Sequence, residues 1–256
     1  AQVVADGGFT QVEHRGQIYN CAAVTQRGRI LGLVPKEKLP TYGVFYEMRT
    51  FTRGRPLQSV DRDGVPLGDL VFDLDFGCLG VEVCEDVWSP DGPMRRRCYA
   101  GAELIVNVSA SPFRMGVLAT RREMLATRSS DNQCTLAYDG LVFDGGGFVL
   151  SNGRPMAEAP RFREGWTAAV VDLDRTARMR TESTTWRLDA QDHGSAVRRV
   201  PAAGPGANRD GLRYPGPPGQ SFFLPAAQAA APRSPRADFC EDILDALALG
   251  IGDYYE

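Results

Sequence analysis

Short runs of apolar residues, separated by polar turns, dominate the first two-thirds of the chain. Two of these runs flank a turn at residues 25–29 and predict a hairpin of paired strands at 17–24 and 30–34. A further turn is predicted at 151–153 because its sequence is Ser-Asn-Gly. The other predicted strands are 70–72, 79–83, 104–107, 141–143, 148–150 and 168–173.

Helical spacing occurs among these strands at residues 117–128. Leu118, Arg122 and Leu125 recur there at steps of four and three residues, which is the period of one helix face. Strands mixed with helices in this order predict an α/β fold built on a layered sheet.

The composition changes between Pro201 and Pro235, where eight of the 17 prolines lie among repeated Gly and Ala. Such a segment does not sustain a helix or a central strand, so we predict a linker arm over residues 201–236. The apolar triplet 222–224 inside it is typical of a segment that docks onto a folded body. The arm separates a larger domain at 1–200 from a C-terminal segment at 237–256.

The C-terminal segment has the pattern of a helix start. Asp238 followed by Glu241 predicts a capped N-terminus, and Gly250 predicts the end of the helix. A capped helix so close to the last residue reads as the entrance to another domain, so we expect the chain to be part of a longer protein. The residues predicted to share one face of this helix are Phe239, Ile243, Ala246 and Leu247.

Composition excludes several classes of protein. With 43% hydrophobic and 24% charged residues, the 256-residue chain has ordinary globular usage, which argues against wholesale disorder. A net charge of −3 gives no basic footprint for nucleic acid, and no apolar run approaches the ~20 residues that cross a bilayer. Six scattered cysteines without a CxxC pair favour reduced thiols in the cytoplasm over a metal site or a disulfide framework.

Cys84 is the strongest candidate for chemistry. It follows the apolar run 79–83, so a buried strand would deliver its thiol to the carboxyl edge of a sheet, where α/β proteins place ligands. A thiolate stabilised by a nearby cation is a strong nucleophile, and the backbone amide of Glu85 could face a developing oxyanion. The alternative interpretation is a buried structural cysteine.

Two further segments place polar residues at the ends of predicted strands. Lys36 directly follows the run 30–34, and beside Cys84 its ammonium would stabilise a thiolate and an oxyanion. Taken alone, Lys36 is more typical of a solvated loop lysine. The small polar residues that end at Ser111 form either a binding rim or an ordinary connection in which a serine caps the next helix.

These segments, in this order, resemble the nitrilase (carbon–nitrogen hydrolase) superfamily, and in detail the glutaminase domains of glutamine-dependent NAD+ synthetases. The resemblance implies an α-β-β-α sandwich with a Glu–Lys–Cys triad, here expected without its N-terminal elements. The resembling segments are 36–42, 45–47, 84–88 (Cys-Glu-Asp-Val-Trp), 107–112 (Asn-Val-Ser-Ala-Ser-Pro), 139–146, 184–187 and 245–254.

The resemblance also implies roles for individual residues. Cys84 would attack the side-chain amide of glutamine to form a thioester, while Lys36 and the Glu85 amide stabilise the oxyanion. Water would then release glutamate, and ammonia would pass to a synthetase domain that uses ATP and Mg to amidate nicotinate adenine dinucleotide. No cofactor or metal is expected in this chain itself, and a homo-oligomer is implied. The matching substrate-binding positions are Tyr42, Glu85, Trp88 and Ser111, and Glu47 matches a carboxylate that supports the lysine.

Several positions depart from the family. The upstream glutamate that serves as general base matches no residue of the chain, since Glu13 lies in a polar hairpin approach and is not assigned that role; loss of such a base costs typically ~10²–10⁴ in rate. Family members carry more residues before Asp139, and a position that is often basic is Val117. The Ser-Gly-Gly-x-Asp-Ser phosphate loop of the synthetase half is absent from these 256 residues.

Two other functions stay open. A stand-alone carbon–nitrogen amidase would hydrolyse small amides without ATP, although residues 201–256 argue against it. An inactive scaffold is favoured by the missing glutamate. Away from these segments, the run Arg95-Arg96-Arg97 is typical of a solvated surface. The cysteines other than Cys84 are expected to pack as small apolar side chains or to have no special role.

Overall fold

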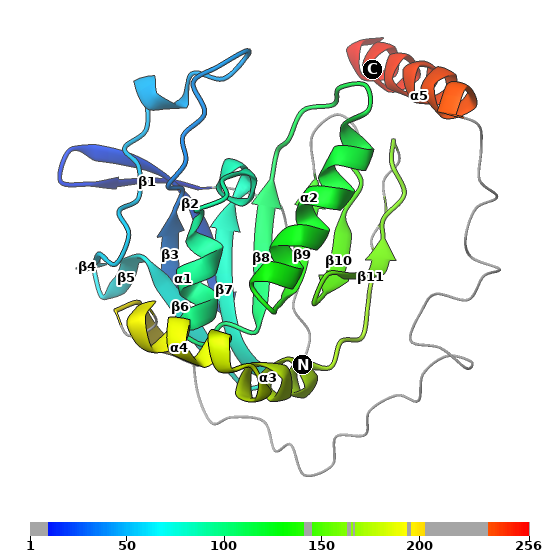
Figure 1. Ribbon diagram of the computed structural model, residues 1–256. Coiled ribbons are helices and arrows are strands. Elements are labelled where there is room, and N and C mark those ends of the chain that lie inside the picture. Colours follow the sequence, from blue (N-terminus) through cyan, green and yellow to red (C-terminus); the bar gives the residue numbers. More distant parts are fainter. Residues whose placement is uncertain are drawn as a thin grey trace.

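Two β-sheets packed face to face form the centre of the molecule (Figure 1). The computed structural model describes residues 10–140, 145–162, 165, 167–193, 196–202 and 235–255. The five-stranded sheet has the order β1-β2-β3-β5-β4. Its strands are β1 (Thr10–His14), β2 (Gln17–Gln26), β3 (Arg29–Pro35), β4 (Ser59–Arg62) and β5 (Val65–Gly68).

The seven-stranded sheet has the order β11-β10-β9-β8-β7-β6-β12. Its central strands β7, β8 and β9 are parallel, so their carboxyl ends lie along one edge of the sheet. The strands are β6 (Leu70–Leu74), β7 (Gly77–Val83), β8 (Leu104–Ser109), β9 (Thr135–Gly140), β10 (Phe148–Ser151), β11 (Arg154–Glu158) and β12 (Arg198–Pro201).

Helices cover the outer face of the seven-stranded sheet. Figure 1 shows α1 and α2 lying across that face, with α3 and α4 along one end of it. Two 3₁₀ helices, η1 and η2, lie in the connections that follow β3 and β7. The helices are α1 (Pro93–Tyr99), α2 (Val117–Asp131), α3 (Leu173–Glu182), α4 (Thr184–His193), α5 (Pro235–Tyr255), η1 (Glu47–Arg49) and η2 (Cys84–Trp88).

Strand alternation divides the apolar residues between two cores. The inter-sheet core fills the space between the sheets, and the sheets pack tightly at Gly32: a Cβ there would lie 2.8 Å from Leu70 Cδ1 and 2.9 Å from Phe72 Cε1. The helix-side core lies between the seven-stranded sheet and its helices. Inter-sheet residues include Val34, Phe72, Leu79, Val81 and Val83, and helix-side residues include Val71, Cys78, Cys98, Ile105 and Leu125.

The α/β sandwich predicted from the sequence is confirmed, as are the first hairpin and the strands that begin near 70, 79, 104 and 148. Asn152 and Gly153 form the predicted turn with φ of +50° and +81°. The predicted helix at 117–128 is also present, but its buried stripe is not the one expected. Val117, Arg121, Leu125 and Ser129 point inward, while Arg122 is exposed.

Two predictions were wrong. The apolar residues at 168–173 form no strand, because Asp172 caps a helix there: its side chain accepts a hydrogen bond from the Arg175 amide at 2.9 Å, and α3 begins at Leu173. Helix α5 begins at Pro235 and continues through Gly250 to Tyr255. A glycine costs a helix only about 1 kcal/mol, so the strong helix formers before it carry the helix past this position.

Some predicted segments lie outside the described residues. These are the strand at 141–143 and the part of the linker arm from 203 to 234, including the apolar triplet. At the start of the predicted linker arm, Pro201 is the last residue of β12, which pairs in parallel with β6. No helix in the described part of the chain combines the length and apolarity needed to cross a bilayer.

Candidate active site

Cys84 lies at a sharp turn between β7 and η2. Its φ is +48°, in the left-handed region where a side chain costs a non-glycine residue on the order of 1–2 kcal/mol. The turn leaves Cys84 largely buried, at 7% exposure, against the inter-sheet core. Its carbonyl oxygen accepts a hydrogen bond from Asn107 Nδ2 of the neighbouring strand β8 at 3.3 Å. A strained turn of this kind presents a nucleophile at the end of a strand.

Lys36 directly follows β3 and is 1% exposed. Its backbone is fixed on both sides: the Lys36 amide donates to Asn20 O at 2.8 Å, and the Gly54 amide donates to Lys36 O at 2.8 Å. The Nζ ammonium donates to Glu47 Oε1 at 2.7 Å, which gives the buried charge a partner. The interpretation of Lys36 as a solvated loop lysine is therefore wrong.

The Asp86 carboxylate joins the lysine segment to the cysteine turn. Its Oδ1 accepts hydrogen bonds from the amides of Glu37 at 3.1 Å and Lys38 at 2.8 Å. Its Oδ2 accepts one from the Val83 amide at 3.0 Å. Burial raises the pKa of Asp86, and these backbone hydrogen bonds act in the opposite direction. One buried side chain thus fixes the strand end that carries Cys84 against the strand end that carries Lys36.

Two arginines of α1 form ion pairs with the carboxylate next to Lys36. Arg96 and Arg97 both pair with Glu37 and Asp69, and Arg97 Nε lies 2.9 Å from Asp69 Oδ1. Burial opposes ionisation of Asp69, but the two guanidinium groups outweigh it and lower its pKa. The expectation of a solvated arginine run is wrong for these two residues, because Arg97 is 1% exposed and Arg96 is partly buried, whereas Arg95 is exposed.

Tyr42 and Glu85 meet at the rim of the site. The Tyr42 hydroxyl donates to Glu85 Oε1 at 2.7 Å, although Tyr42 itself is 59% exposed. Partial burial and this hydrogen bond raise the pKa of Tyr42 to about 12, so the hydroxyl keeps its proton at neutral pH. Two predicted substrate-binding residues, 43 positions apart in sequence, are therefore in direct contact.

Ser111 lies beyond the end of β8 beside two residues that sequence reasoning missed. Arg121 of α2, fully buried, donates from Nη2 to Ser111 Oγ at 3.4 Å, and its guanidinium lies 5.8 Å from the centre of the Tyr138 ring. The Tyr138 hydroxyl hydrogen-bonds to Ser109 Oγ at 2.9 Å. Burial raises the pKa of Tyr138, with a smaller contribution from nearby Cys84. Tyr138 and Arg121 therefore line the same sheet edge as the cysteine.

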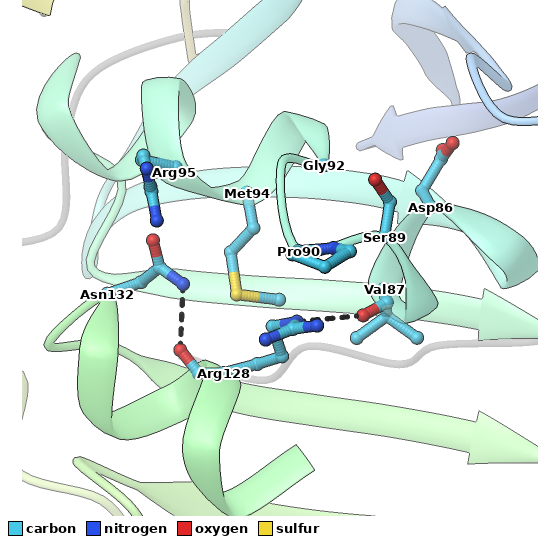
Figure 2. Close-up of a pocket in the computed structure, with 9 residues that line it drawn as sticks. All are labelled: Asp86, Val87, Ser89, Pro90, Gly92, Met94, Arg95, Arg128 and Asn132. Atoms are coloured by element: carbon cyan, nitrogen blue, oxygen red, sulfur yellow. Dashed lines mark hydrogen bonds between the residues drawn. The ribbon is translucent and has the colours of Figure 1, made fainter. Parts of the chain in front are cut away.

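Trp88 ends η2 and packs half-buried against the helix-side core. Figure 2 shows how α2 secures this end of the turn: Arg128 reaches across a shallow hollow to the backbone of η2. Arg128 Nε donates to Val87 O at 3.1 Å and Nη2 to Trp88 O at 3.4 Å. These two hydrogen bonds hold η2 against α2. Contact of the Trp88 ring with a substrate stays a prediction.

The arrangement provides a thiol, a fixed cation and a polar rim. Cys84 and Lys36 come from opposing sheets at strand ends held together by Asp86, and Tyr42, Glu85 and Ser111 add hydrogen-bonding groups around them. Attack by sulfur on a carbonyl carbon next to a stabilising ammonium is the chemistry that such a set supports. Within the described residues, no three or more His, Cys, Asp or Glu side chains gather to hold a metal ion.

Comparison with known families agrees with this geometry. The carbon–nitrogen hydrolase family model matches residues 1–181, so the chain belongs to the carbon–nitrogen hydrolase family. The carbon–nitrogen hydrolase of Helicobacter pylori has the same fold, with a TM-score of 0.58 at 24% identity over 71% of this chain and 65% of that one.

Within the family, the chain is similar to glutamine-dependent NAD(+) synthetases. It is 36% identical over 178 residues to that of Aquifex aeolicus, covering 66% of this chain and 29% of the relative. It is 38% identical over 189 residues to that of Mycobacterium tuberculosis H37Rv, covering 67% and 27%. The solved synthetase of Cytophaga hutchinsonii aligns with a TM-score of 0.55 at 26% identity, over 60% and 27% of the two chains. The chain spans little more than a quarter of these relatives' length.

Proposed function

We propose that this chain is the glutaminase portion of a glutamine-dependent NAD+ synthetase and that Cys84 hydrolyses glutamine to glutamate and ammonia. The observation that carries the proposal is the junction made by Asp86, which holds the Lys36 segment against the Cys84 turn. Sequence similarity to synthetases of that name supports the choice of glutamine over other amides.

The reaction begins when Cys84 Sγ attacks the side-chain carbonyl carbon of glutamine. A C–S bond forms, and the carbonyl electron pair moves to oxygen, where the Lys36 ammonium and the Glu85 amide stabilise it. The C–N bond then breaks, and ammonia leaves with the proton taken from the thiol. Water cleaves the thioester, which releases glutamate and restores the thiol. The glutamate that moves these protons in the family matches no residue of this chain.

The rim selects glutamine by charge. The Glu85 carboxylate, held by the Tyr42 hydroxyl, attracts the α-ammonium of an amino acid. Ser111, held by Arg121, offers a hydroxyl to the polar end of the same ligand. Trp88 completes the substrate-binding set predicted from the sequence, and Glu47 keeps the lysine ammonium in place.

Ammonia released at Cys84 would pass to the ATP- and Mg-dependent synthetase domain of the same protein, which amidates nicotinate adenine dinucleotide. This coupling makes the protein a ligase supplied by an amidase, and we expect it to act in the cytoplasm as a homo-oligomer. We assign no cofactor to the residues of this chain.

The proposal is tested by trapping the nucleophile in the full-length protein with a diazo ketone that mimics glutamine. Intact mass and peptide mapping should place one adduct on Cys84, and Cys84→Ala should abolish it. Cys240→Ala, at an exposed thiol outside the site, is the matched control and should keep the adduct. Glutamate release that survives Cys84→Ala would overturn the mechanism, and faster turnover of simple amides than of glutamine would assign a general amidase instead.

A further inference from the structure

Glu82 is a buried carboxyl group that the mechanism above does not use. It lies on β7 two residues before Cys84 and is 0% exposed. Strand alternation turns its side chain toward the helix-covered face, opposite to Val81 and Val83 of the inter-sheet core. A carboxylate so deeply buried needs either a cation of its own or a proton.

Asn107 connects Glu82 to the backbone of Cys84. The two side chains lie opposite each other on paired strands, in the register Glu82↔Asn107. Asn107 Nδ2 donates to Glu82 Oε1 at 3.2 Å and to Cys84 O at 3.3 Å. A side-chain amide has two N–H hydrogens, so each acceptor takes one. Because both acceptors are oxygens, the orientation of the Asn107 amide is fixed.

Two oxygens are left over in this arrangement. Glu82 Oε2 and Asn107 Oδ1 are both buried, and neither has a hydrogen-bond partner among the described residues. Two unpaired acceptors on hydrogen-bonded side chains repel where they approach each other, whereas a proton on the acid turns one of them into a donor. A neutral carboxylic acid and an amide can then exchange two hydrogen bonds side by side.

We propose that Glu82 is a positioning residue that carries a proton on Oε2 and donates it to Asn107 Oδ1, which holds the Asn107 amide on the Cys84 carbonyl. This deepens the proposed function and rests on Cys84 as its nucleophile. The acid–amide pair stabilises the left-handed turn at Cys84, because Asn107 supplies the hydrogen bond to that residue's carbonyl. Glu82 acts through Asn107 and touches no reacting atom.

The groups around Glu82 favour its neutral form. Burial raises the pKa of Glu82 to about 8, and the Asp86 carboxylate of η2 adds to the effect. The nearby thiols of Cys98 and Cys134 offer no positive charge. Arg97 of α1 opposes the shift, but its guanidinium pairs with Asp69 and Glu37. The hydrogen bond from Asn107 of β8 to Glu82 Oε1 also opposes the shift, but burial outweighs it.

Ionisation of Glu82 therefore weakens the site. Without its proton, Oε2 repels Asn107 Oδ1, and the amide leaves the geometry in which it also serves the Cys84 carbonyl. Above the pKa of Glu82, Cys84 should therefore react more slowly than it would if Glu82 kept its proton. Glu82→Gln removes this dependence, because its amide N–H replaces the acid O–H at every pH.

The test compares Cys84 alkylation by iodoacetamide in the full-length protein and in Glu82→Gln across neutral and alkaline pH. The two rates should agree within about twofold at neutral pH. Above the pKa of Glu82 the ratio of wild type to variant should fall, by up to about tenfold per pH unit. Glu123→Gln, at an exposed glutamate on α2, should follow the wild-type profile. Parallel profiles for the wild type and Glu82→Gln would overturn the proposal.

A spectroscopic readout separates this proposal from the glutaminase assignment. The wild-type minus Glu82→Gln infrared difference spectrum at neutral pH should contain the carbonyl band of a protonated carboxylic acid. An ionised Glu82 at neutral pH would contradict the proposal even if glutamine is hydrolysed. If the band and the pH-dependent ratio are present but no glutamine is hydrolysed, the positioning role stands and the proposed function fails.

Discussion

Asp86 Oδ1 accepts a hydrogen bond of 2.8 Å from the amide of Lys38, a residue 48 positions earlier in the chain. Its carboxylate also binds the amides of Glu37 and Val83, so it joins the opposing sheets at the strand ends that carry Lys36 and Cys84. The bonds from the Glu37 and Val83 amides are buried, and leaving such a buried donor unsatisfied costs about 1–3 kcal/mol.

Asp86→Ala should therefore be the most damaging change outside the reacting groups. We expect a loss of about 2–5 kcal/mol in the free energy of unfolding and a fall in kcat for glutamine hydrolysis of at least about tenfold. Asp86→Asn keeps the Oδ1 acceptor and should recover part of both. Denaturant unfolding and steady-state kinetics measure them, with exposed Asp91→Asn as control. Unchanged kcat in Asp86→Ala would contradict a positioning role.

Removal of the buried ammonium should act on chemistry rather than on binding. Lys36→Met leaves the Glu47 carboxylate without its 2.7 Å partner, and in the proposed mechanism it removes the cation that stabilises the oxyanion. By comparison with oxyanion donors elsewhere, kcat should fall by about 10²–10³ with a smaller change in KM. Lys38→Met is the matched control, because the hydrogen bond from Lys38 to Asp86 comes from its backbone amide, which the variant keeps. Equal losses in the two variants would argue against Lys36 as the stabilising group.

Tyr42→Phe should affect recognition of the substrate. It removes the hydroxyl that holds Glu85, and because Tyr42 is exposed, stability should change by less than about 0.5 kcal/mol. We expect KM for glutamine to rise several-fold while kcat stays within about twofold. Tyr46→Phe, on the same exposed segment, should leave both constants unchanged. A fall in kcat at constant KM would show instead that Tyr42 acts in the chemical step.

The pH dependence of the free energy of unfolding tests whether Glu82 carries a proton in the folded protein. Its pKa rises from 4.5 to about 8 on folding, so between these values the folded protein binds more protons than the unfolded chain. The contribution of Glu82 to the free energy of unfolding is greatest below pH 4.5. It declines as the pH rises, by up to about 1.4 kcal/mol per pH unit, until about pH 8. Chemical denaturation of the wild type and Glu82→Gln at several pH values measures the difference. A constant difference across this window would show that Glu82 is ionised throughout.

Much of the site was predictable because it lies at strand ends. The apolar runs before Lys36 and Cys84 predicted two strands, and the chain leaves each at the residue expected to carry chemistry. The family resemblance added Tyr42 and Glu85, which the structure brings into contact. Position along a strand is a local property, and a single sequence records it well.

The supporting residues were not predictable for the opposite reason. Arg96 and Arg97 belong to a basic run that is typical of a surface, and their burial depends on carboxylates at positions 37 and 69 that only the fold brings near. Arg121 was hidden likewise, because a buried arginine breaks the apolar stripe of α2. Periodicity detects apolar faces but not buried charges whose partners are far away in sequence.

The most direct test of the central claim is acid-quenched mass spectrometry of the full-length protein mixed with glutamine. We expect a transient γ-glutamyl thioester on the peptide that contains Cys84, with its decay matched by the appearance of free glutamate. Glutamate formed without that adduct, or a Cys84 that stays unmodified in the presence of glutamine, would contradict it.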